Sequence, residues 1–258
     1  MPDRISLEVP LNIYCAPGQN PDGGGLSPQD PFNSLVEAYE TIRNNYDLRN
    51  YKVTCRIVNG TYNCPQAGMT VWGPLFGGSD ESDFLITGDP NNINAVELIG
   101  SGIEAHDGAR LLVKNLTMGL SGGPACLRAS TFGALEYGNI RFLQINSYHI
   151  LCRNAFMAQV GPVWVRGASR HISIHDSGVV ELFNQSLTFE NSPSWNEAFV
   201  VITGGGTLQI WNMSISGTAS GQRWRIMGPA NIDASGAHIG WMGNQAGYYN
   251  SSPINGTV

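Results

Sequence analysis

Two glutamates stand at the same offset from a recurring asparagine, and such a pair could do acid–base chemistry on a sugar. Glu136 lies three residues before Asn139, and Glu181 lies three residues before Asn184. Two carboxyl groups about 6.5–9.5 Å apart form the acid and base of an inverting glycosidase. If the protein is an enzyme, Glu136 and Glu181 are therefore its candidate catalytic residues.

Residues that suit sugar binding stand at neighbouring offsets from the asparagines. Flat aromatic faces beside amide and guanidinium groups can stack on a sugar ring and bind its hydroxyl groups. The candidate ligand-binding residues are Trp164, Arg166, Phe183, Gln209 and Trp211. Alternatively, the glutamates serve solubility, and Trp164 and Trp211 pack under a loop or against a neighbouring subunit.

These residues lie in a repeat that spans the second half of the chain. Each window has apolar residues four and two positions before an asparagine and another three positions after it. The asparagines are Asn115, Asn139, Asn184 and Asn212, and a fifth, degenerate window has Gly167 in the asparagine position. The degenerate window places Trp164 in line with the glutamates, and Arg166 in line with Phe183 and Trp211.

A regular strand pattern with variable spacing favours a right-handed parallel β-helix within the all-β class. A β-propeller blade would need about 40 residues per repeat. Asparagine adopts left-handed backbone angles at tight corners, and stacked asparagines can bond to each other along the axis. Strands stack about 4.8 Å apart, so the backbones of Glu136 and Glu181, two coils apart, would be about 9.6 Å apart.

One amphipathic helix is expected near the N-terminus. Asp30 can cap it, Pro31 suits its first position, and an apolar stripe runs from Phe32 to Ile42. An open β-helix end exposes strand edges, so a helix over residues 31–46 would cover it. We expect one continuous domain: strand, loop and capping helix in 1–50, coils in 51–220, and a closing coil and tail in 221–258. The final AGYYNSSPINGTV could cap the other end or pair with another chain.

Composition excludes several partners. Hydrophobic residues make up 42% of the chain and charged residues only 13%, and the net charge is −6. A negative chain is a poor partner for nucleic acid or for an anionic membrane, and no apolar run is long enough for membrane insertion. The N-terminus lacks the apolar stretch of a signal peptide.

The cysteines and histidines offer little metal chemistry. The five cysteines include no CxxC pair, which favours buried free thiols over disulfides. Cys126 and Cys152 both stand in C-x-x-A, so they could stack in an interior column. His171 and His175, beside Asp176, would share one strand face but lie about 13 Å apart, too far for one ion. We expect no metal and no cofactor.

Three segments resemble the β-helix domain of bacteriophage tail-spike and tail-fibre proteins. IYCAPGQNPDGGGLSPQDPFNSLVEAYETI (13–42) resembles its start, VTCRIVNGTYN (53–63) its first coil and GTASGQRWRI (217–226) its closing coil. The resemblance covers nearly the whole chain. It implies a pectate-lyase-like β-helix, a homotrimer and adhesion to bacterial surface polysaccharide, which some members also cleave.

Together these observations predict a spike or fibre protein on the surface of a phage or phage-like particle. It would be made in the host cytoplasm, contact other virion proteins and bind host surface polysaccharide without cleaving it. One alternative is a glycan depolymerase, either hydrolase or lyase, of the same fold. Another is a structural spike without a ligand.

Overall fold

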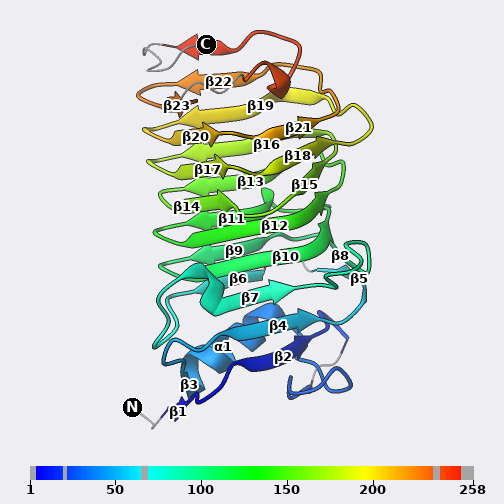
Figure 1. Ribbon diagram of the computed structural model, residues 1–258, viewed down its shortest axis with the longest axis vertical. Helices are drawn as coiled ribbons and strands as arrows, with labels where there is room; N and C mark the ends of the chain where they lie inside the picture. The colour runs from blue at the N-terminus through cyan, green and yellow to red at the C-terminus, as the bar shows by residue number, and fades with distance from the viewer. Residues whose placement is uncertain (1–3, 20–21, 65–68, 235–238, 251–258) are drawn as a thin grey trace.

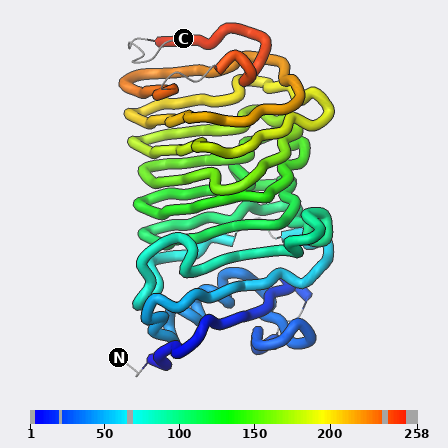
Figure 2. Tube along the Cα trace, viewed as in Figure 1, coloured from blue at the N-terminus to red at the C-terminus, as the bar shows by residue number. Residues whose placement is uncertain are grey.

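The chain winds into a parallel β-solenoid of about seven turns, as the asparagine repeat predicts. The structure is a computed structural model and describes residues 4–19, 22–64, 69–234 and 239–250. Its coils stack along one long axis, with the two chain ends at opposite ends of the stack (Figure 1, Figure 2). We call the strands of one turn a rung.

Sheet 1 has fourteen strands and forms two sides of the solenoid. Its main path is β2 (Leu11–Cys15), β4 (Val53–Ile57), β7 (Phe84–Thr87), β10 (Arg110–Met118), β12 (Ala134–Phe142), β14 (Phe156–Gln159), β17 (Val179–Phe183), β20 (Thr207–Trp211) and β23 (Asn231–Asp233). Its side arm, beyond a corner, contains β5 (Gly60–Asn63), β8 (Val96–Ile99), β15 (Val163–Val165), β18 (Ser186–Phe189) and β21 (Ser214–Ser216).

Sheet 2 has eight parallel strands and forms the remaining side. Its strands are β6 (Met69–Trp72), β9 (Ile103–His106), β11 (Ala125–Ser130), β13 (Tyr148–Arg153), β16 (Ala168–His175), β19 (Trp195–Thr203), β22 (Trp224–Met227) and β24 (Tyr248–Asn250). Two short strands, β1 (Ile5–Ser6) and β3 (Tyr46–Asp47), pair separately near the N-terminus. The 3-10 helices η1 (Glu81–Asp83) and η2 (Gly240–Met242) lie in connections.

Alternation along each strand separates the core from the surface. In β12, Leu135 and Tyr137 are fully buried, while Glu136 between them is partly exposed. Their neighbours one rung below, Leu111 and Val113, are buried in register. Stacked apolar columns of this kind form one continuous core.

The repeated asparagines lie at the corner between the main path of sheet 1 and its side arm. Asn115, Asn139, Asn184 and Asn212 all have positive φ, from 48° to 60°. The Asn212 side chain donates a hydrogen bond of 2.9 Å to Asn184, one rung below. The predicted roles of asparagine, left-handed corners and bonding along the axis, are therefore confirmed.

The window with Gly167 in the asparagine position has a different register from the one expected. The rung between Asn139 and Asn184 is formed by β14 and β15, and its register brings Gly161, not Gly167, to the asparagine corner. A Cβ atom on Gly138 would lie only 2.6 Å from the Gly161 nitrogen, so the two backbones approach closely there. The missing side chain of Gly138 permits this approach.

The single α-helix of the described residues is shorter than predicted. Helix α1 spans Leu35–Asn45, and Ser34, not Asp30, caps it by accepting a bond from the Glu37 amide at 3.0 Å. The expected start was wrong because Phe32 lies extended beside β2, where its amide bonds to the Tyr14 carbonyl. The helix packs against β6, the first strand of sheet 2, at the N-terminal end of the stack.

The C-terminal part continues the stack. β22 and β23 pair with β19 and β20, and β24 pairs with β22. Residues 251–258, which end the tail that was expected to cap or pair, lie outside the described residues. In the described parts of the chain, no helix has the length and apolar character needed to cross a bilayer.

All five cysteines are buried free thiols, as expected. Cys126 and Cys152 do not stack, however. Cys152 pairs with Ala129, and the register places Cys126 opposite His149. The expectation failed because the C-x-x-A segments enter β11 and β13 at positions three residues apart.

Candidate functional site

The outer face of sheet 1 brings the two candidate catalytic glutamates into one column. Along this column Glu136 pairs with Ala158, Ala158 with Glu181, and Glu181 with Gln209. Glu136 and Glu181 are thus two rungs apart, as predicted, with only a methyl group between them. Two rungs correspond to about 9.6 Å between backbones.

Both carboxyl groups are harder to ionise than a glutamate in water. Burial is the main cause for Glu136, and the nearby Glu81 carboxylate adds to it, so the pKa of Glu136 is raised. Lys114 opposes this shift in part. The pKa of Glu181 is also raised, by burial. A raised pKa favours the protonated form that a general acid needs.

An aromatic pair follows the acids along the same strands. Phe183 pairs directly with Trp211 on the next rung, and Gln209 lies two residues before Trp211. The Trp211 side chain is 57% exposed, although burying such a ring would stabilise the fold. Phe183, Gln209 and Trp211 are therefore close neighbours on one outer surface.

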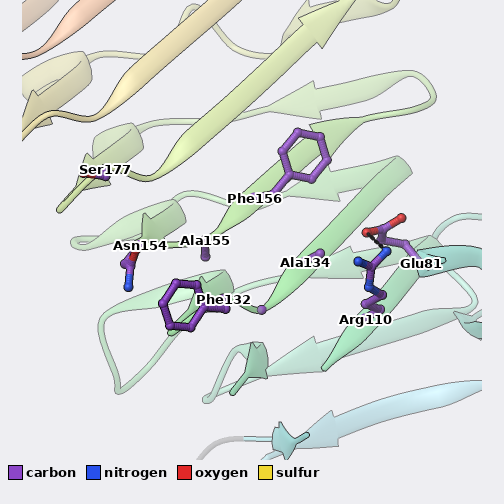
Figure 3. A pocket seen from close by; sticks show the side chains of 9 residues that line it. Glu81, Arg110, Phe132, Ala134, Asn154, Ala155, Phe156 and Ser177 are labelled. Carbon is purple, nitrogen blue, oxygen red and sulfur yellow. Dashed lines mark ion pairs between the residues drawn. The ribbon is translucent and has the colours of Figure 1, made fainter. Parts of the chain in front are cut away.

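A hollow of about 450 Å³ precedes the acids on sheet 1 (Figure 3). Its floor is Ala134, whose outward neighbours on the rungs below and above are Arg110 and Phe156. Ala134 has only a methyl group between these two longer side chains, which leaves the hollow open. Arg110 forms an ion pair of 3.5 Å with Glu81 at one side of the hollow.

Phe132 lines the opposite side of this hollow in an unfavourable state. Its side chain is 73% exposed, and its backbone has a φ of 64°. Left-handed angles cost a residue other than glycine about 1–2 kcal/mol. The turn itself is a recurring element of this chain, because Asp176 and Ser177 adopt the same pair of left-handed conformations.

Trp164 and Arg166 lie elsewhere, so the expected alignment of Trp164 with the glutamates and of Arg166 with Phe183 and Trp211 is wrong. Trp164 is in β15 on the side arm, where it pairs with Arg141 and Thr188. The Arg166 Nε atom contacts Glu190 at 3.1 Å, and Arg141 binds the same carboxylate. The error has the same origin as the misaligned window: Gly161 occupies the corner.

The predicted shared face of His171 and His175 is also wrong. His171 is fully buried among Phe142, Phe199 and His149. His175 lies on the outer face of sheet 2, between the Ser173 and Thr203 hydroxyl groups. The in–out alternation of β16 is interrupted between them, because the residues from His171 to Ile174 are all buried. The described residues contain no group of three or more side chains arranged to hold a metal ion.

Sequence reasoning missed a polar network on the outer face of sheet 2. Glu104 accepts hydrogen bonds from Thr70 at 2.9 Å and Ser130 at 2.6 Å, and forms an ion pair with Arg128. The sequence contains a signal for this face, because the residues of one outward column each stand nine positions before a repeat asparagine. That column contains His106, Ser130, His175 and Thr203.

Comparisons with known proteins add no relative. No protein-family model, curated protein sequence or solved structure matches the chain.

Proposed function

We propose that the outer face of sheet 1 binds a polysaccharide of a bacterial cell surface. The observation that carries the proposal is the direct pairing of Phe183 with the exposed Trp211, beside Glu181 and Gln209. These two aromatic side chains come from neighbouring strands, whose backbones lie about 4.8 Å apart. Each offers a flat face on which a sugar ring can stack. The carboxylate and amide next to them supply acceptors and donors for sugar hydroxyl groups.

The shape of this surface suits a chain better than a single sugar. The hollow above Ala134, the Glu136–Glu181 column and the aromatic pair follow one another along the strands of sheet 1. Several weak contacts along one chain add to a useful affinity.

Attachment of a phage or phage-like particle to its host is the biological role that we infer for this binding. The resemblance of residues 13–42 and 53–63 to tail-spike and tail-fibre proteins supports it. The same resemblance supports a homotrimer in contact with other virion proteins on the particle surface. Light scattering tests the trimer, because a mass of one chain in solution contradicts it.

Tryptophan variants test the binding surface. We expect Trp211→Ala to weaken binding to host-range capsular and lipopolysaccharide preparations at least tenfold, with an unchanged melting temperature. Trp164→Ala, on the side arm, is the matched control and should bind as the unaltered protein does. Loss of binding in Trp164→Ala alone, or no binding to any preparation, contradicts the proposal.

A glycan depolymerase is the second candidate, favoured by the shared column of Glu136 and Glu181 and by their raised pKa values. If it is correct, incubation with the bound polysaccharide releases new reducing ends or an unsaturated sugar that absorbs in the ultraviolet. Glu136→Gln and Glu181→Gln should abolish release and keep binding, whereas the control Glu8→Gln should keep both. Polysaccharide that is bound but stays intact rejects this candidate.

A further inference from the structure

A second groove lies on sheet 2, away from the surface proposed above. Its volume is about 540 Å³, and the residues that shape it include Glu104, His106, Arg128, Tyr148, Arg153 and His175. The groove arises where shorter side chains stand beside long ones. Leu151 and then Ser173 follow Arg128 in one outward column, and Ser130 stands between His106 and Arg153 in the next.

The walls of this groove are held rigidly. On one side, Glu104 is fixed by Thr70, Ser130 and Arg128. On another, the Tyr148 ring is covered by the Arg170 guanidinium at 4.6 Å.

His175 completes the wall and is fixed at both ring nitrogens. Its Nε2 atom is 2.8 Å from the Ser173 hydroxyl, and its Nδ1 atom is 2.7 Å from the Thr203 hydroxyl. Side chains fixed in this way need little ordering when a ligand arrives.

One cationic side chain of the groove has a solvent-exposed partner. Arg128 is neutralised by the Glu104 carboxylate, whose side chain is only 10% exposed. Arg153 is paired instead with the exposed Asp176, and water screens a pair of this kind. Arg153 is therefore the cation of this groove that an anionic group of a ligand can reach.

Arg153 has donors to spare. Its Nε atom contacts Asp176 at 3.1 Å, and both side chains are about 60% exposed. That contact runs through Nε, and neither Nη atom donates a hydrogen bond to another of the described residues. An exposed pair of this kind is weak, whereas a guanidinium edge binds a carboxylate through two parallel hydrogen bonds.

We propose that this groove binds a hexuronic acid residue of a glycan, with its carboxylate on the Nη atoms of Arg153. The planar carboxylate matches the guanidinium edge, and the sugar hydroxyl groups face the polar walls. Binding here does not depend on sheet 1, so the two surfaces are tested separately.

Calorimetry with matched trisaccharides tests the proposal. The probes are trisaccharides of galacturonate, glucuronate and mannuronate, each with its methyl ester, which keeps the shape and removes the charge. We expect at least one acid to bind, with its ester at least tenfold weaker. Equal binding of acid and ester, or no binding of any acid, overturns the proposal.

Arginine variants locate the contact. Arg153→Ala should weaken binding of the acid at least tenfold, and Arg153→Lys should be intermediate because it keeps the charge without the planar edge. Arg225→Ala, on the same sheet but outside the groove, and Trp211→Ala, on sheet 1, should bind normally. Unchanged binding by Arg153→Ala overturns the proposal.

A sulfated trisaccharide separates carboxylate recognition from general attraction of anions. We expect a 6-sulfated galactose trisaccharide to bind more weakly than the best uronate. Equal affinity, with equal loss on adding salt, contradicts a carboxylate site. If the uronates fail while Trp211→Ala still weakens polysaccharide binding, only the sheet 2 proposal fails.

Discussion

The side-chain amide of Asn139 donates a hydrogen bond of 2.5 Å to the side-chain oxygen of Asn115, one rung below. Asn115 in turn donates to the Thr87 hydroxyl at 2.8 Å. Both asparagines have left-handed backbone angles. One residue type thus turns the chain at the corner and binds the neighbouring rungs to each other.

Replacing Asn139 separates these two contributions. Asn139→Ala loses the hydrogen bond and also strains the corner, so we expect a loss of about 2 kcal/mol in the free energy of unfolding. Asn139→Gly keeps the corner and loses the bond, at a cost of about 1 kcal/mol. Urea denaturation measures both values. An alanine variant as stable as the glycine variant would show that backbone strain at the corner is unimportant.

The buried histidine pair makes stability depend on pH. The His149 Nε2 atom donates to the Leu143 carbonyl at 2.9 Å, so its Nδ1 atom accepts from His171 at 3.1 Å. Burial lowers the pKa of His149 to about 4. Burial, and then the neighbouring His149, also lower the pKa of His171.

In the unfolded chain these histidines titrate near 6.5, so it binds more protons than the folded protein between pH 6.5 and 4. Stability is therefore full above pH 6.5 and falls as the pH drops to about 4, by about 3 kcal/mol from His149 alone. Melting temperatures across this range measure the effect. The double variant His149→Phe/His171→Phe should lose most of this pH dependence; an unchanged slope would contradict the assignment.

Glu104 should stabilise sheet 2 through its partners. Glu104→Gln leaves the partly buried Arg128 guanidinium without its carboxylate, and we expect a loss of about 2 kcal/mol in the free energy of unfolding. Glu97→Gln is the control and should cost less than about 0.5 kcal/mol, because the Glu97 carboxylate accepts a hydrogen bond of 3.3 Å from the exposed Thr61 hydroxyl. Equal losses in the two variants would argue against a special role for Glu104.

The thiols should be inert while the protein is folded. Burial raises the pKa of Cys64 to about 11 and that of Cys152 to about 12, and it also raises the pKa of Cys126. Because the thiolate is the reactive form, we expect labelling by a disulfide reagent at pH 8 to be very slow. Adding denaturant should expose all five thiols at once. Rapid labelling of the native protein would contradict this burial.

The fold was predictable because asparagine and apolar positions report the corner and the core directly. The rung of β14 and β15 was not, since Gly161 replaces the asparagine and removes the only marker of the corner. The helix start at Ser34 was missed because Asp30 and Pro31 resemble a cap, while pairing of Phe32 with β2 keeps that segment extended. Tertiary pairing overrode the local signal.

The arrangement of the candidate residues was predictable where the register held. Glu181 and Phe183 were correctly placed beside Gln209 and Trp211, because β17 and β20 pair without a shift. Trp164 and Arg153 belong to the rung that has Gly161 at its corner. Without an asparagine to mark that corner, Trp164 was misplaced and Arg153 was missed.

The nearest neighbours of an outward side chain in this solenoid are the residues paired with it on the strands directly above and below. A column such as Glu136, Ala158, Glu181 and Gln209 can therefore be changed one position at a time while the apolar columns beneath it stay intact. Surface chemistry and foldability are largely uncoupled in such an architecture. Under the proposed function, a change of ligand would then require few substitutions and no new scaffold.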